Sequence, residues 1–578
     1  SGPVTIRNAT LNIGCGSTQT FQDLRIEHNL AVLSGSANMA VAANMQWQNG
    51  TILGSGAPTA TFTLNGGANA IWPNSGTVGP RILESRDFLN MGSILINANN
   101  NATGLKNNSR LVNMVGANLT LDIGSGIATL FTSGVGTPEL LNQGNLTVQT
   151  GGTWAITSRF TNSGSVNLTG PIQLYLQGAG TDIGSYSVDT TSQLYIDSPA
   201  GIRTIAGSGS ISGNGALLLG NGGQLTVTAP TYTIRNTIIG AAANTQLDLS
   251  TGATVSVQEL TLLAGAVGGT LTGTSPIETT VDFQHLQGLI TTTAAGTPSL
   301  TVSGSASWST AAIKTYRQRA LVINGTANWS GGNIALETGA SMAIQPTRTL
   351  NTTFPGTNGQ ITCISVCSSS FTNLGNFNKT AAGTISIDSE INFSQQGNLS
   401  VQGGTLEIPT GFTQSNGQTV IAAGATLELQ TGTLAVDAGL LTGSGLVNGA
   451  VTNNASLNPG SSPGILTISG NYTQSATGSL QIQVAGLAPG TQHDVLNVGG
   501  QANLNGALVV QDFGFTPTPP DAFAFLNASG GVTGLFSSST IPYAGYTPTY
   551  GANSVILSAL GGIVVNSVGD PGDGVCNG

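Results

Sequence analysis

The sequence predicts an all-β fold, a β-solenoid with coils of roughly 20–22 residues. Repeated motifs give the first evidence. Gly304-Ser-Ala-Ser-Trp308-Ser returns 21 residues later as Gly325-Thr-Ala-Asn-Trp329-Ser. In the same way, Phe371-Thr-Asn-Leu-Gly375 returns 22 residues later as Phe393-Ser-Gln-Gln-Gly397, and the glycines of Leu141-Asn-Gln-Gly144 and Phe160-Thr-Asn-Ser-Gly164 lie 20 apart. Drifting periods of roughly 20 residues are typical of stacked β-coils.

Short apolar triplets interrupted by glycine give the second evidence. In Leu119–Ile123, Leu225–Val227 and Leu466–Ile468, apolar and polar residues alternate with period two, as in a strand buried on one face. Asn-Gly and Ser-Gly dipeptides separate such triplets at the spacing of coil corners. Helical periodicity is almost absent. Its best candidate, Ala312–Val322, lies between two copies of the tryptophan repeat, so we expect a coil insertion or a strand there.

Composition limits the class of protein. Glycine accounts for 83 of 578 residues, and charged residues for 7%, against roughly 25% in ordinary domains. No run of about 18 apolar residues occurs, so no transmembrane segment is predicted. The net charge of −10 and the lack of a dense basic stretch disfavour nucleic-acid binding. A surface of hydroxyl and amide groups suits an extracellular matrix or carbohydrate neighbours.

The repeats change character near residue 370. Residues 1–370 carry irregular solenoid coils, whereas residues 371–560 carry more regular ones, and residues 561–578 are expected to form a linker. The chain has no signal peptide at Ser1 and shows no closing cap before it ends abruptly at Gly578. We therefore expect a portion of a longer precursor.

The second block of coils carries a family resemblance. Asn458-Pro-Gly-Ser-Ser-Pro-Gly464, Gly470-Asn-Tyr-Thr-Gln474 and His493-Asp-Val-Leu-Asn-Val498 resemble the rung segment of autotransporter passengers and of exported bacterial β-helix proteins with PEP-CTERM- or IPTL-CTERM-type sorting tails. The resemblance implies a right-handed parallel β-helix, located outside the cell or at the bacterial surface. Val565–Cys576 is similar, more weakly, to the opening of a CSLREAI domain, which would continue past the last residue.

Tryptophans are the first candidate site residues. Trp47-Gln-Asn-Gly50-Thr-Ile52 and Trp329-Ser-Gly-Gly332-Asn-Ile334 share the pattern Trp-x-x-Gly-x-Ile, and Trp308 lies one coil before Trp329. The three rings could stack inside the solenoid or form an aromatic platform for sugars. A glycine three residues after tryptophan is what a tight corner needs, which favours the structural interpretation. The platform predicts rings that are exposed to solvent.

Ionisable residues give little support to catalysis or metal binding. Asp388 and Glu390 lie two apart on an expected strand and so face the same side, as acids do in polysaccharide-cleaving β-helices. Only Lys379 lies nearby, and the three histidines are isolated in the sequence, so neither a catalytic triad nor a zinc site is indicated. We predict no enzyme activity, no cofactor and no metal.

Four cysteines are too few for a disulfide scaffold. Cys363 and Cys367 have a spacing that allows, but does not demand, a small disulfide loop at a coil edge. Cys15 and Cys576 lie near opposite ends of the chain and could join successive subunits. The favoured alternative is that Cys576 pairs with a cysteine further downstream and that Cys15 is simply buried.

These observations lead to a functional hypothesis. The chain is expected to be a structural extracellular protein, the rod-like subunit of a bacterial surface filament, matrix or adhesin. It would self-associate head to tail by strand addition at the coil ends. The expected partners are further copies of the same chain and a surface or matrix polysaccharide. The alternatives are a carbohydrate-binding adhesin, a monomeric stalk that presents another domain and, less favoured, a polysaccharide-degrading enzyme.

Overall fold

The computed structural model describes residues 2–14, 16–55, 60–74, 79–98, 102–197, 201–354, 356–365, 367–460 and 463–560. These residues contain 65 strands and no helix. The predicted linker at 561–578, with its CSLREAI-like segment, lies outside them. The chain forms two compact units: unit 1 comprises Ser1–Asn351, Gly359–Phe371 and Glu390–Asn392, and unit 2 comprises Thr352–Asn358, Thr372–Ser389 and Phe393–Gly578.

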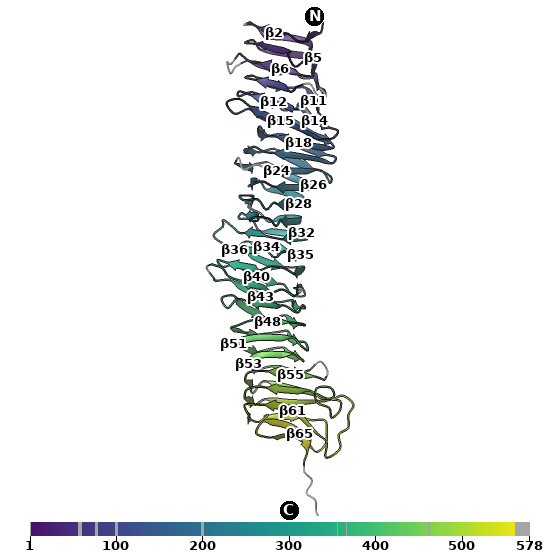
Figure 1. Cartoon of the computed structure of the whole chain (residues 1–578), viewed down its shortest axis with the longest axis vertical. Coiled ribbons are helices and arrows are strands. Elements are labelled where there is room, and N and C mark those ends of the chain that lie inside the picture. Colours follow the sequence, from purple (N-terminus) through teal and green to yellow (C-terminus); the bar gives the residue numbers. More distant parts are fainter. Residues whose placement is uncertain are drawn as a thin grey trace, which may run out of the picture. The chain divides into compact units, whose positions relative to one another are not determined.

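Each unit is a stack of coils in which strands pair in parallel with strands of the next coil (Figure 1). This confirms the predicted all-β parallel solenoid. The candidate helix at Ala312–Val322 is replaced by β36 (Lys314–Arg317) and the start of β37 (Ala320–Ile323). Both strands pair with the coils before and after them.

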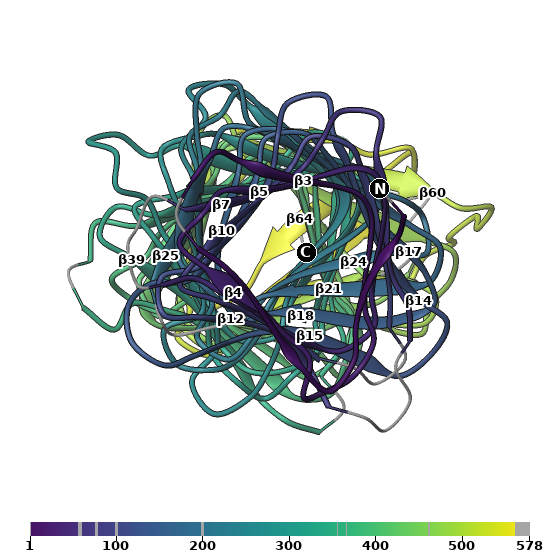
Figure 2. The same ribbon diagram turned by 90° about the horizontal axis from the view of Figure 1, so that it is seen from above.

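Three sheets form the sides of the coils in unit 1. Sheet I includes β8 (Asn69–Trp72), β11 (Ser93–Asn97), β14 (Asn118–Ile123), β17 (Asn145–Thr150), β20 (Ser165–Thr169) and β23 (Ser185–Val188). Sheet II includes β7 (Thr61–Leu64), β10 (Asp87–Asn90), β13 (Arg110–Asn113), β16 (Glu139–Asn142) and β19 (Arg159–Asn162). Sheet III includes β9 (Arg81–Glu84), β12 (Ala102–Lys106), β15 (Ile127–Ser133), β18 (Gly152–Ile156), β21 (Ile172–Leu176) and β24 (Gln193–Ile196). Figure 2 shows strands of the three sheets on three different sides of the coil.

Coil length varies along the chain. Glu139 pairs with Arg159, a step that matches the predicted period. Arg110, however, pairs with Glu139 across a much longer coil, and in unit 2 Leu440 pairs with Ser456 across a shorter one. Extra residues leave the stack as loops at the corners, where the backbone can bond with water, and so do not disturb the registered strands.

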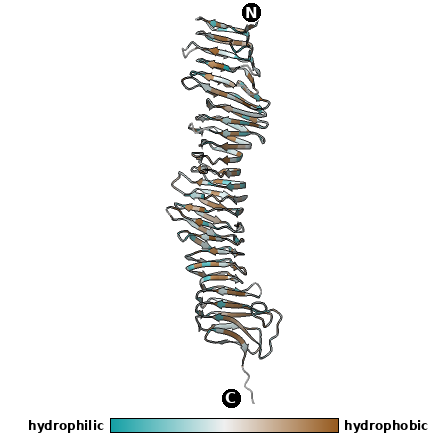
Figure 3. Ribbon diagram, viewed as in Figure 1, coloured by the Kyte–Doolittle hydropathy of each residue, from teal (hydrophilic) through white to brown (hydrophobic). Residues whose placement is uncertain are grey.

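Alternation along each strand builds the interior. In β14, Leu119 and Leu121 point inward and are almost fully buried, whereas Thr120 is half-buried on the outer face. Leu119 is in register with Leu146, which is in register with Val166, so apolar side chains stack from coil to coil. Apolar and polar residues therefore alternate along the strands in Figure 3. Each buried Leu or Val contributes about 1.5–3 kcal/mol through the hydrophobic effect.

A ladder of buried asparagines accounts for one of the sequence repeats. The Nδ2 atoms of Asn90, Asn113 and Asn142 each donate to Oδ1 of the next asparagine in the series, the last being Asn162, over 2.7–2.8 Å. Each also donates to a backbone carbonyl of the next coil. Gly164 follows Asn162 at the same corner, and a Cβ there would collide with the carbonyl oxygen of Gly144. The Asn-x-Gly motif thus arises because a buried asparagine amide is followed by a position where the backbone of the neighbouring coil leaves no room for a Cβ.

The C-terminal coil of unit 2 carries a cap, so the expectation of a chain without one is wrong. β58 (Val495–Val498) pairs in parallel with β61 (Ala522–Ala528), but the next strand on β61 is β65 (Ser554–Ala559), which runs antiparallel and pairs with β64 (Tyr546–Tyr550). The aromatic rings of Phe523 in β61, of Tyr543, and of Tyr546 in β64 pack against one another and join the hairpin to the coil. The cap was not predicted because antiparallel pairing leaves no periodic signal in the sequence.

Candidate functional site

All three candidate tryptophans are buried in unit 1. Trp47, Trp308 and Trp329 have 0% of their surface exposed, so a sugar ring has no access to their faces. The indole N–H of Trp47 donates to the carbonyl of Gly50 over 3.3 Å, and that of Trp329 to the carbonyl of Gly332 over 2.8 Å. The Trp-x-x-Gly pattern therefore closes a coil corner. The glycan platform on these residues has no support because the rings fill the interior.

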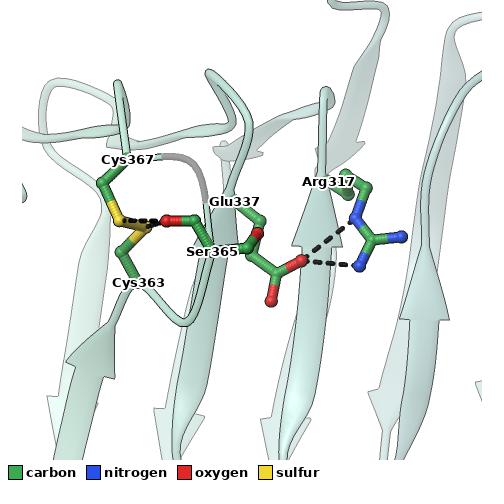
Figure 4. The surroundings of a disulfide bond; sticks show 5 residues. All are labelled: Arg317, Glu337, Cys363, Ser365 and Cys367. Carbon is green, nitrogen blue, oxygen red and sulfur yellow. Dashed lines mark hydrogen bonds and ion pairs between the residues drawn. A yellow bond between two sulfur atoms is a disulfide. The ribbon is translucent and has the colours of Figure 1, made fainter.

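The structure places Cys363 and Cys367 in a disulfide at the edge of a coil of unit 1, with Cα atoms 5.8 Å apart (Figure 4). Their sulfur atoms and a carboxylate oxygen of Glu390 lie within 4.8 Å of one another. Sulfurs joined in a disulfide are not thiolates, so this cluster does not have the chemistry of a metal centre. Cys15 and Cys576 lie outside the described residues.

A hollow of about 500 Å³ lies beside the disulfide loop. Its wall includes the exposed side chains of Val267, Ile313 and Ile364. Arg317 donates through Nε and Nη2 to Oε2 of Glu337, over 3.0 and 2.7 Å (Figure 4). The guanidinium and the carboxylate satisfy one another, and the rest of the wall combines apolar groups with the polar side chains of Thr270, Gln287 and Thr315.

The strand expected at Asp388 and Glu390 is wrong, because β45 (Thr384–Ile387) ends before Asp388 and Glu390 lies in the turn that follows. Lys379, the basic residue near this acidic pair in the sequence, lies in unit 2. Its side chain is buried, and Nζ donates to the carbonyls of Ala381 and Gly403. Burial lowers the pKa of Lys379 to about 8. The ammonium group therefore ties two neighbouring corners together.

Unit 1 contains a buried ionic cluster that sequence reasoning missed. Arg203 Nη1 lies 2.6 Å from Asp182 Oδ2, and both side chains are almost fully buried. Tyr186 donates to the same oxygen over 2.8 Å, and the amide of Asn162 donates to the other carboxylate oxygen over 2.7 Å. Burial, followed by the charge of Asp182, raises the pKa of Tyr186 well above its ordinary value, so the phenol stays a donor.

Other buried arginines also bridge coils through the backbone. Arg319 donates to the carbonyls of Gly273, Ser275 and Thr291 over 2.8–3.2 Å. Arg86 donates to the carbonyls of Ala37 and Thr61 over 3.0–3.1 Å. No local sequence signal indicates this role, because the partners lie up to two coils away in sequence.

The outer face of sheet III carries a pair of stacked tyrosines that the sequence analysis also missed. Tyr175 and Tyr195 have ring centroids 4.1 Å apart and planes inclined by 8°. A signal for them exists, since Gln173-Leu-Tyr175 returns one coil period later as Gln193-Leu-Tyr195.

No protein-family model matches the chain, and a search of curated proteins finds no relative. Within the described ranges, no helix is long and apolar enough to cross a membrane. A functional conclusion therefore depends on the geometry of the chain itself.

Proposed function

We propose that the protein is a structural β-solenoid, a support within a bacterial surface layer, matrix or adhesin. The observation that carries this proposal is the use of its buried polar groups. The asparagine ladder, the Asp182–Arg203 pair and Lys379 all bind neighbouring coils. The polar groups that could otherwise bind a substrate instead form hydrogen bonds between one coil and the next, as a load-resisting stack requires.

Two features favour a location outside the cytoplasm. The Cys363–Cys367 disulfide is chemistry that persists in oxidising compartments. In the segment that resembles exported β-helix proteins, the buried carboxylate of Asp494 accepts from the amides of Gly464 and Gln483 over 2.8 and 2.9 Å. The motif residues Gly464 and Asp494 thus share one structural role, which is to fasten a corner loop to the coil.

The cap favours a monomeric support over a head-to-tail filament. β65 occupies the hydrogen-bonding edge of β61, and the amide of Val532, in β62 (Val532–Gly534), donates to the carbonyl of Ala552 in the hairpin turn. Strand addition needs free edge groups, and the hairpin uses those of β61 and reaches β62, so that among the described residues β63 (Ser538–Thr540) is the strand of this coil that the hairpin leaves uncovered. We therefore propose the stalk in place of polymerisation through this coil.

Light scattering after gel filtration, with electron microscopy of the same fractions, tests the proposal. At micromolar concentration we expect single particles of the 578-residue chain. A variant ending at residue 544, which lacks β64 and β65, should form larger assemblies because β61 then exposes its edge. A variant ending at residue 560 is the matched control and should behave as the full chain does. Filaments formed by the full chain would contradict the monomeric support.

A further inference from the structure

We propose that the outer face of sheet III, from β18 to β28 (Thr231–Ile239), binds a neutral polysaccharide through the stacked Tyr175–Tyr195 pair and an adjoining polar hollow. This inference goes beyond the structural role and does not depend on it. It also replaces the buried tryptophans with a platform that solvent reaches.

The tyrosine pair is held in place by polar neighbours on the same face. Gln173 Nε2 donates to Gln193 Oε1 over 2.9 Å, and the hydroxyl of Tyr195 donates to the same oxygen over 2.9 Å. Burial, followed by the neighbouring Tyr195, raises the pKa of Tyr175 to about 12, so its hydroxyl remains protonated at neutral pH. The pair therefore offers rigid rings and fixed hydroxyls, the combination that sugar rings bind.

Small and apolar residues extend the platform on both sides. Tyr175 is in register with Ala155 on the preceding coil, and a methyl group covers little of the ring face. On the following coils, Tyr195 is in register with Leu218 of β26 (Ser210–Leu219), and Leu218 with Ile238. All the side chains in this row are half-buried on the outer face. The row forms a continuous apolar strip next to the glutamines.

A polar hollow of about 230 Å³ lies beside this strip. Thr191, Gln193, Asn214, Arg235, Asn236 and Glu259 are among the residues that line it. The Oδ1 atom of Asn236 is buried, and it has no hydrogen-bond partner within the described ranges. A buried amide oxygen without a partner is destabilising, so a small rearrangement that lets a hydroxyl donate to it is favourable.

Charge around the hollow selects a neutral ligand. Arg235 Nη2 lies 3.0 Å from Glu259 Oε1, so this cation of the lining is already paired. Asp189 accepts from the backbone amides of Gly170 and Thr191 and stays ionised close by. An anionic polymer would meet this carboxylate, and the guanidinium is already paired with Glu259 in the same lining, whereas neutral hydroxyl groups match the amides and hydroxyls of the lining.

The length of the strip indicates a polymer. Successive coils are about 4.8 Å apart, so the four steps from β18 to β28 span roughly 19 Å. Tyr175 and Asn236 are separated by most of that length, which exceeds the reach of a single sugar ring. An extended chain running along the coil axis can contact both.

Affinity electrophoresis of the whole chain tests this site. Native gels contain a neutral polymer (mixed-linkage β-glucan, galactomannan or dextran) or the anionic polygalacturonate. We expect retardation in at least one neutral gel and none in polygalacturonate. The double variant Tyr175→Ala/Tyr195→Ala should weaken binding roughly ten-fold, because both ring faces are lost. Tyr175→Phe/Tyr195→Phe should retain most of the affinity.

A matched control lies on sheet I, where Thr120 and Thr147 are in register on the outer face of neighbouring coils. Thr120→Ala/Thr147→Ala should bind as the unmodified chain does. Circular dichroism on heating checks that each variant is folded. Nitration of tyrosine, read by mass spectrometry, should reach Tyr175 and Tyr195 in the free protein and be suppressed by the bound polymer.

Three results would overturn the proposal: no retardation in any neutral gel, retardation in polygalacturonate, or retardation in a neutral gel that survives both alanines. None of these results bears on the oligomeric state that tests the structural role.

Discussion

Removing the carboxylate of Asp182 should weaken unit 1 locally and severely. In Asp182→Ala, the guanidinium of Arg203 keeps its bonds to the carbonyls of Phe160 and Gly178 but loses its counter-charge. The Tyr186 hydroxyl loses its acceptor in the same change. Both groups are almost completely buried, so water cannot replace the lost oxygen atoms.

The expected cost follows from this burial. Breaking a buried ion pair by removing one partner costs about 3–5 kcal/mol, because a charge is left buried without compensation. The exposed pair Asp87–Arg110 provides the comparison, since 47% of the arginine side chain is exposed to solvent. Asp87→Ala should cost only about 0.2–1 kcal/mol.

Hydrogen exchange read by mass spectrometry is the appropriate assay, because a solenoid can open coil by coil and does not unfold as one two-state unit. Amide protection in β19, β22 (Gly180–Asp182) and β25 (Ile202–Ile205) should fall by roughly two to three and a half orders of magnitude in Asp182→Ala. Adding Arg203→Leu to Asp182→Ala should restore part of the amide protection, because it removes the buried charge that has lost its partner. Equal effects of Asp182→Ala and Asp87→Ala would refute the reasoning.

Three further predictions concern unit 1. Burial lowers the pKa of His285 to about 3, so the stability present above its ordinary pKa near 6.5 is lost as the pH falls. Between pH 6.5 and 4.5 this amounts to about 2–3 kcal/mol, to be read as lost amide protection in β32 (Ile277–His285) after correction for the intrinsic exchange rate, and His285→Gln should flatten the slope. Asn142→Ala should cost about 2–5 kcal/mol by removing the hydrogen bonds that join Asn142 to Asn113, Asn162 and the Ser165 carbonyl, against less than about 0.5 kcal/mol for the exposed Asn145→Ala; equal losses of amide protection would contradict the ladder. Gly164→Ala should prevent tight coil stacking, whereas Gly296→Ala, with open space around the added methyl group, should melt as the parent does.

The candidate sites show which structural features a local sequence pattern can predict and which it cannot. The Trp-x-x-Gly pattern predicts a corner, and the corner is there, with the indole bonded to the glycine carbonyl. The Gln-Leu-Tyr repeat would have revealed the tyrosine pair, because an echo at the coil period places equivalent side chains one above the other. By contrast, no pattern shows that Arg319 reaches carbonyls more than 40 positions earlier in the chain.

Local pattern alone was enough to define the solenoid: alternation of period two fixes which side chains face inward, and the echoes at the coil period fix that coils stack on coils. Which residues meet was settled only in the folded stack. Loops of unequal length shift the register, so Arg110 lies beside Glu139 and Glu139 beside Arg159, although the first step along the chain is much longer than the second. Folding also decided that β64 and β65 turn back on β61, since antiparallel pairing depends on the free edge of a finished coil, which is a property of the folded stack and not of any stretch of residues.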